Sequence, residues 1–539
     1  MTPTGDSSIM KITKLTCAAG MILAAGAVGC NNDSLTNLNT NPNSPEVVPP
    51  SAIFTSAARL SAAYFIGNTY DLRQTQFVAQ HWAEAQYPDE DRYARLDPAS
   101  TGGVWVGIGG VGGSYSTQLM DLKKVSDAGL AANDPGIWAP AQILSSWNFE
   151  YLTDTWGDIP YTEALKGDTA GGSLTPKFDS QKDVYAGLIA TLTKAAAALT
   201  TASNSFGSAD PVYHGDPAAW AKFANSLRAR LAMRLVNVDP ATADAQLKAA
   251  FTDPAGVFTS NADMATLVWP GDGIYNNPMT DNFSTRDDHR VSQTLANILV
   301  ANNDPRTPVF MQERDSIPPG ETGLYAGMPN GLTASAAGNY LRTASRPGSY
   351  LYPGATTYGN YGSSANKANP SYFMTYAELC FIQAEAAERG MGGLTPSQAA
   401  GFYNAGIAAS MNQWGITDVG AIAAYEASPN VAYKGGTAGL TQIAIQKWIA
   451  LIDDGSQSWA EWRRTCQPST IVAGPAAVVN YVPRRFYYPT TEYSVNPTGI
   501  AGAIASQGAD NFATRIYWDS NPTAAPTYVS ATTCAGSHS

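Results

Sequence analysis

Apolar residues recur at intervals of three and four along much of the chain, the spacing that places them on one face of an α-helix. The apolar residues of the segment 180–199 follow this spacing and form one face, and Ser180 with Asp183 resembles a capping box. The same pattern predicts helices over residues 51–66, 70–84, 115–130, 139–155, 217–235, 372–388, 395–411 and 440–453.

Residues 217–235 show the helix signals most completely. Asp216 can cap the helix, and Pro217 suits its first position. The apolar stripe starts at Trp220, and three arginines lie mostly off it: Arg228, Arg230 and Arg234. The pattern predicts a helix with one buried face.

Long segments rich in Gly, Pro, Asn, Ser and Tyr separate the helices, over residues 253–287 and 305–370. Loops of this length are usually functional or disordered, and their aromatic content favours ordered, packed loops. The sequence therefore predicts a mainly α fold of paired helices, similar to a solenoid, although no repeat can be read directly from it.

The N-terminal region has the layout of a lipoprotein signal peptide. A short basic start is followed by an apolar run over residues 15–28, which is too short to span a bilayer as a helix. Ala27 and Gly29 precede Cys30 as in a lipobox, although leucine is usual at the position of Ala27. We expect residues 1–29 to be removed, Cys30 to carry the lipid, residues 30–50 to form a linker, and residues 51–539 to form one domain.

The net charge and the apolar runs of the chain narrow the classes of partner that it could bind. The net charge of −12 would repel a nucleic acid, and downstream of residue 28 no second apolar run is long enough to span a membrane. A diacyl or triacyl Cys30 would therefore carry the membrane attachment.

The remaining cysteines are Cys380, Cys466 and Cys534. Cys380 fits a helical core, while Cys466 and Cys534 could form a disulfide in an oxidising compartment; their spacing does not decide whether that bond forms.

Enzyme signatures are weak. Residues 107–112 read G-x-G-x-x-G, the pattern of a dinucleotide-binding motif. Such a fold also needs an acidic residue at the end of a second strand about 20 residues further on, but there the sequence has Asp134 in a turn. We therefore interpret the motif as a flexible glycine loop. The four histidines show no metal-ligand spacing. Residues 89–91 are three consecutive acids, which we interpret as a solvated turn, with calcium binding as an alternative. We expect no cofactor and no catalytic metal.

Aromatic residues provide the more informative chemistry. Rings in loops can stack on the apolar C–H faces of a sugar while neighbouring amides and carboxylates bind its hydroxyls. Two segments combine these groups, and the candidate ligand-binding residues are Trp82, Tyr87, Trp269, Asp272, Tyr275 and Asn276. For any single ring, packing in the core is the competing interpretation.

Several motifs together resemble the SusD/RagB-like family of nutrient-binding outer-membrane lipoproteins. The most specific match is residues 151–165, YLTDTWGDIPYTEAL. Others, in order, are LNTNPN at 38–43, FDSQKDVY at 178–185, WAKFANSLR at 220–228, TYAEL at 375–379 with AEA at 384–386, QKW at 446–448 with WRR at 462–464, and PRRFYYP at 483–489. These segments are spread in this order over most of the mature chain.

The resemblance implies a fold of tetratricopeptide-like helix pairs whose loops build the ligand surface. It also implies a non-catalytic protein that captures an oligosaccharide, or in some branches a peptide, for import through a SusC-like TonB-dependent barrel. Arg463 and Arg464 would pair with buried carboxylates or carbonyls, and Gly157 with Pro160 would set a turn. We expect an outer-membrane location facing the exterior, although Asn31-Asn32-Asp33 is poorer in acids than the family's export signal.

Two alternatives from other classes remain open at this point. A surface glycoside hydrolase needs only two carboxylates across a cleft, which sequence spacing cannot exclude. A helical scaffold that docks a partner protein without any small ligand would show the same helix pattern.

Overall fold

The computed structural model describes residues 48–108, 111–352 and 366–519. Residues from Pro50 onward form one unit by their contacts. The predicted signal peptide and Cys30 lie outside the described residues. In the part of the chain that is described, no helix is both long enough and apolar enough to span a membrane.

Helices predominate, as the periodicity predicts. Ser180 caps α8 by accepting the N–H of Asp183, and Asp216 caps α9 by accepting that of Ala218. The longer helices are α3 (Pro50–Phe65), α5 (Pro98–Val106), α6 (Gln118–Ala131), α7 (Pro135–Trp156), α8 (Gln181–Leu199), α9 (Pro217–Arg234), α10 (Pro240–Phe251), α12 (Gln293–Ala301), α15 (Tyr376–Glu388), α16 (Pro396–Gln413), α17 (Val419–Glu426), α18 (Gly436–Ala450), α19 (Gly455–Thr465) and α21 (Pro497–Gln507).

Short elements occupy the long segments between these helices. The short helices are the π-helix η1 (Asn68–Thr75), α4 (Gln76–Val78), α11 (Pro278–Asn282), α13 (Thr307–Phe310), α14 (Ala334–Gly338) and α20 (Glu492–Val495), with 3-10 turns η2 (Ala94–Leu96), η3 (Gly207–Ala209), η4 (Leu235–Asn237), η5 (Asn261–Asp263) and η7 (Tyr517–Asp519). Each strand pairs antiparallel with one other: β1 (Trp82–Glu84) with β7 (His289–Val291), β2 (Gly107–Ile108) with β3 (Val111–Gly112), β4 (Ile159–Pro160) with β5 (Phe178–Asp179), and β6 (Ala265–Leu267) with β8 (Ser371–Met374).

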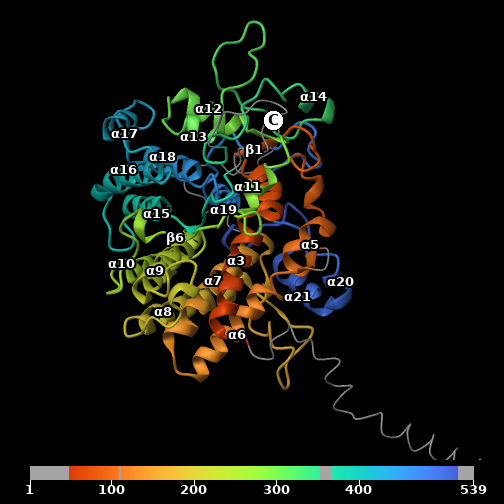
Figure 1. The fold of residues 1–539 in the computed structure, drawn as a ribbon, viewed down its shortest axis with the longest axis vertical. Coiled ribbons are helices and arrows are strands. Elements are labelled where there is room, and N and C mark those ends of the chain that lie inside the picture. Colours follow the sequence, from red (N-terminus) through yellow and green to blue (C-terminus); the bar gives the residue numbers. More distant parts are fainter. Residues whose placement is uncertain (1–47, 109–110, 353–365, 520–539) are drawn as a thin grey trace, which may run out of the picture. The chain divides into compact units, whose positions relative to one another are not determined.

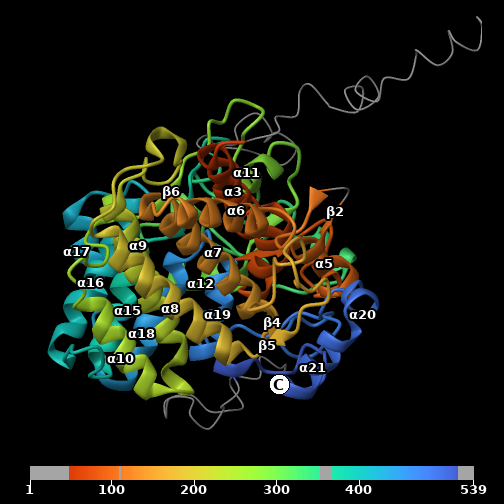
Figure 2. The same cartoon turned by 90° about the horizontal axis from the view of Figure 1, so that it is seen from below.

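Helices that are neighbours in sequence pack against each other. The run α6, α7, α8, α9 and α10 packs in that order, and α3 lies against α6 and α7. α15 packs on α9, α16 and α18, and α18 continues to α19. Figures 1 and 2 show the yellow-green α8, α9 and α10 beside the teal α15 and α16. The predicted framework of helix pairs is therefore present.

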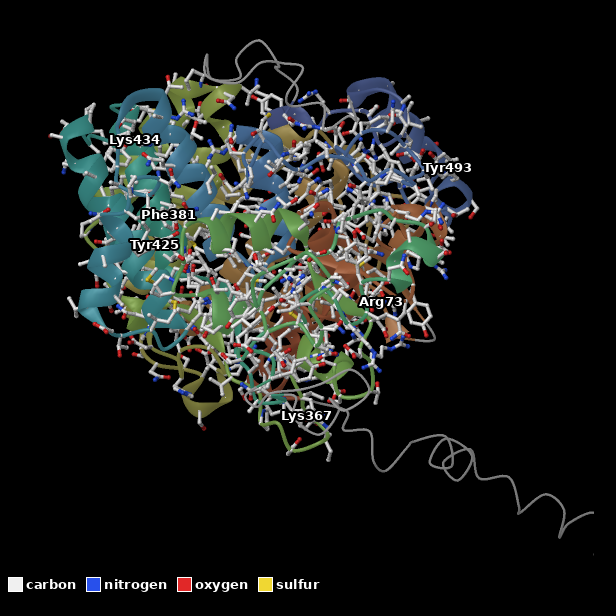
Figure 3. The ribbon with its side chains drawn as sticks, turned by 90° about the horizontal axis from the view of Figure 1, so that it is seen from above. Arg73, Lys367, Phe381, Tyr425, Lys434 and Tyr493 are labelled. Carbon is white, nitrogen blue, oxygen red and sulfur yellow. The ribbon has the colours of Figure 1, made fainter. Side chains whose placement is uncertain are left out.

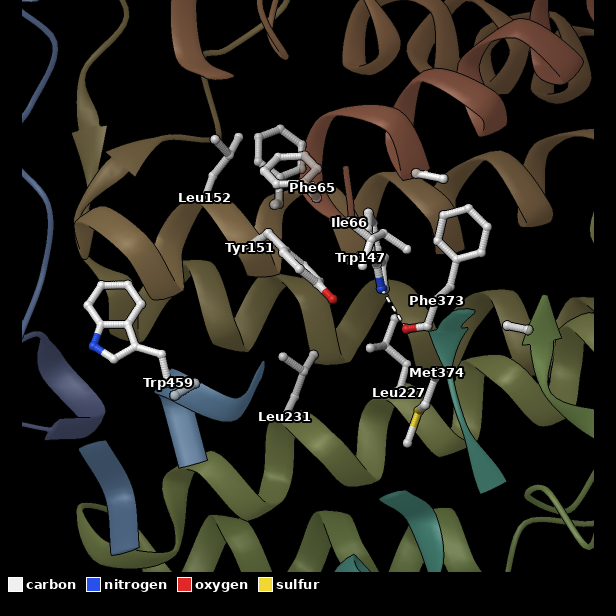
Figure 4. Packing of buried hydrophobic residues seen from close by; sticks show 14 of the residues in the cluster. Phe65, Ile66, Trp147, Tyr151, Leu152, Leu227, Leu231, Phe373, Met374 and Trp459 are labelled. Carbon is white, nitrogen blue, oxygen red and sulfur yellow. Dashed lines mark hydrogen bonds between the residues drawn. The ribbon is translucent and has the colours of Figure 1, made fainter. Parts of the chain in front are cut away.

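An aromatic core joins these layers. Trp147 on α7 lies edge-on to Phe65 on α3 and to Phe373 on β8, with ring centroids 5.7 and 4.9 Å apart. Its indole Nε1 also donates to the carbonyl oxygen of Phe373 at 2.9 Å (Figure 4). Tyr151, one turn further along α7, has its ring centroid 4.2 Å from that of Trp147. The core therefore ties a scaffold helix to a strand more than two hundred residues away.

Three predicted segments differ from the structure in the type of element that they contain. Residues 70–84 form a π-helix, a short α-helix and then strand β1, because Trp82 to Glu84 pair with β7. The helix predicted over 372–388 starts at Tyr376, since β8 precedes it and Thr375 caps it. Residues 107–108 and 111–112 of the glycine motif follow helix α5 and pair as the strands β2 and β3, so the motif does not join a strand to a helix as a dinucleotide fingerprint does.

The structure tests part of what the sequence predicts for the cysteines. Cys380 is a buried free thiol, as expected for a small side chain in a helical core. Cys466 is disulfide-bonded, and its partner lies outside the described residues. That this partner is Cys534 stays a prediction.

Buried ion pairs link the scaffold helices. Arg230 on α9 donates to Glu378 on α15 through Nε and Nη2 at 2.7 and 2.6 Å, and through Nη1 to Glu150 on α7 at 3.2 Å. Arg464 on α19 binds Glu385 on α15 at 2.7 and 2.6 Å. These side chains are at most 5% exposed. The interpretation of α9 as a helix with one buried face was therefore incomplete, because its arginines are buried as well.

We expect Arg230→Met to lower the free energy of unfolding by about 3–5 kcal/mol, because it leaves two buried carboxylates without their cation. Arg228→Met on the same helix is the matched control, since Arg228 donates only to the amide oxygen of Gln246. Urea unfolding followed by circular dichroism measures both. Equal losses in the two variants would show that the ion pairs do not hold the helices together.

Acid should weaken the same network. Burial alone would raise the pKa of Glu385, but the Arg464 guanidinium outweighs it and holds that pKa at about 2. In the unfolded chain a glutamate has a pKa of about 4.3. The stabilisation from the ion pair of Glu385 and Arg464 is therefore complete above that pH and is lost as the pH falls toward about 2. Glu385→Gln should reduce the slope of unfolding free energy against pH in this range by up to about 1.4 kcal/mol per pH unit. An unchanged slope would contradict the assignment.

Candidate functional site

Helix α12 forms a ridge between two hollows. Gln293, Asn297 and Ala301 follow one another at intervals of four, so they lie on one face of the helix, and these three residues line both hollows. Ser292 caps the helix by accepting the N–H of Thr294, and Leu295 and Leu299 bury the opposite face. The local sequence thus turns two carboxamides toward solvent on an anchored helix.

The first hollow, of about 550 Å³, lies between α12, α16, α18 and the loop after α17. It is lined by amide, hydroxyl and aliphatic side chains and by no charged residue. Some of these side chains are held by the scaffold: Gln446 donates to the phenol oxygen of Tyr425 at 2.8 Å, and Tyr425 is labelled in Figure 3. Within the described chain, Gln293, Asn297 and Asn430 make no side-chain hydrogen bond, which leaves their amides available to a ligand.

The second hollow, of about 580 Å³, lies on the other side of the ridge. Tyr325 and Tyr340 line it together with the two ridge amides. Its charges cancel, because Arg314 donates to Glu321 at 2.5 Å. Tyrosine rings beside unbonded amides can hold a neutral, hydroxyl-rich ligand, since the rings cover apolar faces and the amides bind hydroxyls.

Two of the predicted ligand residues are buried. Trp82 is 0% exposed within β1, and Trp269 is 2% exposed with its indole Nε1 donating to the Ser371 hydroxyl at 2.9 Å. Neither ring has a face open to a ligand, so the expectation that these two rings stack on one is corrected: both belong to the core.

The two predicted tyrosines are exposed. Tyr87 is 50% exposed, and the guanidinium carbon of Arg286 lies 5.5 Å from the centre of its ring. Tyr275 is 45% exposed, with Arg59 at 5.3 Å in the same relation. Each ring is thus steadied by a cation–π contact while about half of its surface faces solvent. Their contact with a ligand stays a prediction.

The predicted polar residues Asp272 and Asn276 are occupied within their own loop. Asp272 accepts the N–H groups of Ile274 and Tyr275 at 2.9 and 2.8 Å. Asn276 accepts the N–H of Gly273 and donates to Asp281. These bonds shape the turn that presents Tyr275, so the two side chains position a ring more directly than they offer groups to a ligand.

The acidic run at residues 89–91 does not converge on one point. Asp89 pairs with Arg92, Glu90 pairs with Arg73, and Asp91 accepts the side-chain amide of Asn330 at 2.7 Å. Because each carboxylate has its own partner, these three residues do not form a shared calcium site.

Comparison with known proteins identifies the fold. The sequence profile of a SusD-like family described as "Starch-binding associating with outer membrane" matches residues 42–489. The chain belongs to this SusD-like family. No curated protein matches the sequence.

Solved structures of SusD-like proteins share the whole fold. One described as a chitin-binding protein is 27% identical, with 88% of this chain and 100% of that one covered and a TM-score of 0.73. A chitin-binding SusD homologue from Flavobacterium johnsoniae is 25% identical, with 87% and 99% covered and a TM-score of 0.71. A SusD homologue from Bacteroides uniformis matches to the same extent.

The family motifs have structural roles in this SusD-like chain. Gly157 ends α7 with a φ of +83°, a conformation that favours glycine, and Pro160 follows in β4. Arg463 donates to the carbonyl oxygens of Asp154 and Arg484 at 2.7 and 2.9 Å, and Arg464 binds a buried carboxylate. The predicted pairing of these arginines is confirmed.

Sequence reasoning missed the ridge. The sequence does contain a signal for it, because Ser292 is followed by two amides four residues apart, with apolar residues on the opposite face of the same helical pattern. Without the fold, however, Gln293 and Asn297 could not be connected to Tyr325 and Tyr340, which lie in a long irregular segment.

Trp269 and Tyr275 provide a matched test of core against surface within one loop. We expect Trp269→Ala to lower the free energy of unfolding by about 3–5 kcal/mol, as for a buried tryptophan, and Tyr275→Ala to change it by less than about 0.5 kcal/mol. Thermal and urea unfolding measure both. A Trp269→Ala variant as stable as the parent would contradict the burial of that ring.

Proposed function

We propose that the chain is a lipid-anchored, non-catalytic binding protein that captures an oligosaccharide and delivers it to a SusC-like TonB-dependent barrel in the outer membrane. Family membership supports the class of protein, and the description of the family names starch binding and the outer membrane. The anchor at Cys30, the exterior face and the barrel partner rest on the sequence and on the family.

The observation that carries the proposal is the chemistry of the α12 ridge. Its two hollows offer unbonded amides, tyrosine phenols and a single internally neutralised ion pair. Such a surface suits a neutral ligand with many hydroxyls, because a charged ligand would find no unpaired counter-charge there. Tyr87 and Tyr275 are proposed as further contact rings.

Chito-oligosaccharides are the first ligands to test. Two of the similar structures are described as chitin-binding. An N-acetyl sugar presents an amide as well as hydroxyls, and side chains such as Gln293 and Asn297 can both donate to and accept from such a group.

The two hollows lack the second carboxyl group that a glycosidase would need. A glycosidase needs two carboxyl groups across the scissile bond. The residues that line the two hollows include one carboxylate, Glu321, which is already paired with Arg314. The ridge is therefore built for binding.

Calorimetry on the purified protein tests the proposal. We expect a chito- or malto-oligosaccharide to bind, and Gln293→Ala with Asn297→Ala to weaken that binding by about tenfold or more, since each lost hydrogen bond is worth roughly 1 kcal/mol. Asn412→Ala is the control, because Asn412 is an exposed helical amide that lines neither hollow.

Three outcomes would overturn parts of the proposal. Parent-like affinity in the double variant would remove the ridge as the site. Shortened sugars after incubation with the protein would favour a hydrolase. A blank screen of sugars and peptides, with a barrel still co-purifying from the native membrane, would favour a docking scaffold.

A further inference from the structure

Three metal-binding side chains meet where β1 pairs with β7. Glu84 ends β1, His289 is its partner in the register, and Asp288 immediately precedes His289. One potential ligand atom from each lies within 4.8 Å of the others, and all three residues are buried. Among residues 48–108, 111–352 and 366–519 this is the only such group.

Two of these side chains have polar atoms without partners. Oε2 of Glu84 and both ring nitrogens of His289 are buried and make no hydrogen bond. Oε2 and Nε2 face each other at 3.7 Å, which is beyond hydrogen-bonding distance. Burying such groups unsatisfied is costly, so their presence calls for an explanation.

The spacing of Glu84 and His289 fits a small cation. Ligand atoms at about 2.0–2.2 Å around a tetrahedral zinc ion lie roughly 3.4 Å apart, close to the 3.7 Å between Oε2 and Nε2. One imidazole with two carboxylates is a donor set for zinc and related divalent ions, whereas calcium prefers oxygen ligands alone.

Three nearby arginines are paired with carboxylates other than Glu84. Arg73 (labelled in Figure 3) pairs with Glu90, Arg290 with Asp287, and Arg286 with Asp288. His289 also lies between two rings, with centroid distances of 5.4 Å to Phe77 and 5.2 Å to Phe283.

We propose that Glu84, Asp288 and His289 bind a divalent transition-metal ion, zinc in the first instance, at the junction of β1 and β7. The ion would fasten two strands that lie about two hundred residues apart in the sequence.

The same ligands support Tyr87. Oε1 of Glu84 accepts the backbone N–H of Tyr87 at 3.0 Å, and Asp288 holds Arg286, whose guanidinium lies over the Tyr87 ring. If Tyr87 contacts the sugar as proposed above, the metal orders that part of the ligand surface. The metal site itself does not depend on the proposed function.

Metal analysis of tag-free protein tests the site. After incubation with zinc chloride and exhaustive desalting, we expect about one equivalent of zinc in the parent and none in His289→Phe. A phenyl ring preserves the packing between Phe77 and Phe283. Should that variant fail to fold, Glu84→Gln serves, because its carboxamide oxygen can still accept the two loop N–H groups.

His214→Asn is the control, since His214 is exposed and has a positive φ that asparagine tolerates. It should keep the zinc. Zinc should also raise the thermal midpoint of the parent and of His214→Asn but not of His289→Phe. A parent that retains no zinc, or zinc retained equally in both His289→Phe and Glu84→Gln, would overturn the proposal whatever the protein does with sugars.

Discussion

Charges buried between helices are the constraint on which the rest of this molecule depends. Glu461 on α19 accepts from Arg464 at 2.6 Å, and it forms ion pairs with Lys447 on α18, at 2.9 Å, and with Arg234 on α9. With the pairs of Arg230 and Glu385, this network reaches α7, α9, α15, α18 and α19. A buried charge is tolerated only beside its counter-charge, so the network fixes how these helices face one another.

The proposed ligand surface depends on that framework. Helix α12 is short and lies in the irregular half of the chain, yet one of its hollows is closed by α16 and α18. Gln446 on α18 lines the hollow and accepts from Arg306 at 2.8 Å, and Arg306 is held in turn by Asp304. A chain of buried polar contacts therefore connects the proposed binding surface to the scaffold.

Much of the fold could be predicted from the sequence. Helices with a polar cap and an apolar stripe, such as α8 after Ser180, were found within a residue or two, because the stripe and the cap are local signals. The burial of Arg230 could not be predicted, since its partners come from α7 and α15 and hydropathy treats every arginine alike. The start of α15 was misplaced because residues 371–374 pair with a distant strand, and sequence periodicity does not reveal such a partner.

The candidate site was less predictable for the same reason. Trp82 and Tyr87 stand five residues apart in sequence, yet strand pairing buries the first and a turn exposes the second. An aromatic residue near a helix end has no local feature that separates these outcomes. Gln293 and Asn297 acquire significance only when the fold brings Tyr325 and Tyr340 beside them.

The proposed function requires that an intact sugar chain binds along α12. A crystal structure of the protein with a chito-oligosaccharide tests it most directly. We expect an unbroken sugar with its polar groups within hydrogen-bonding distance of Gln293 and Asn297. A sugar bound away from α12, or one found cleaved, would contradict it.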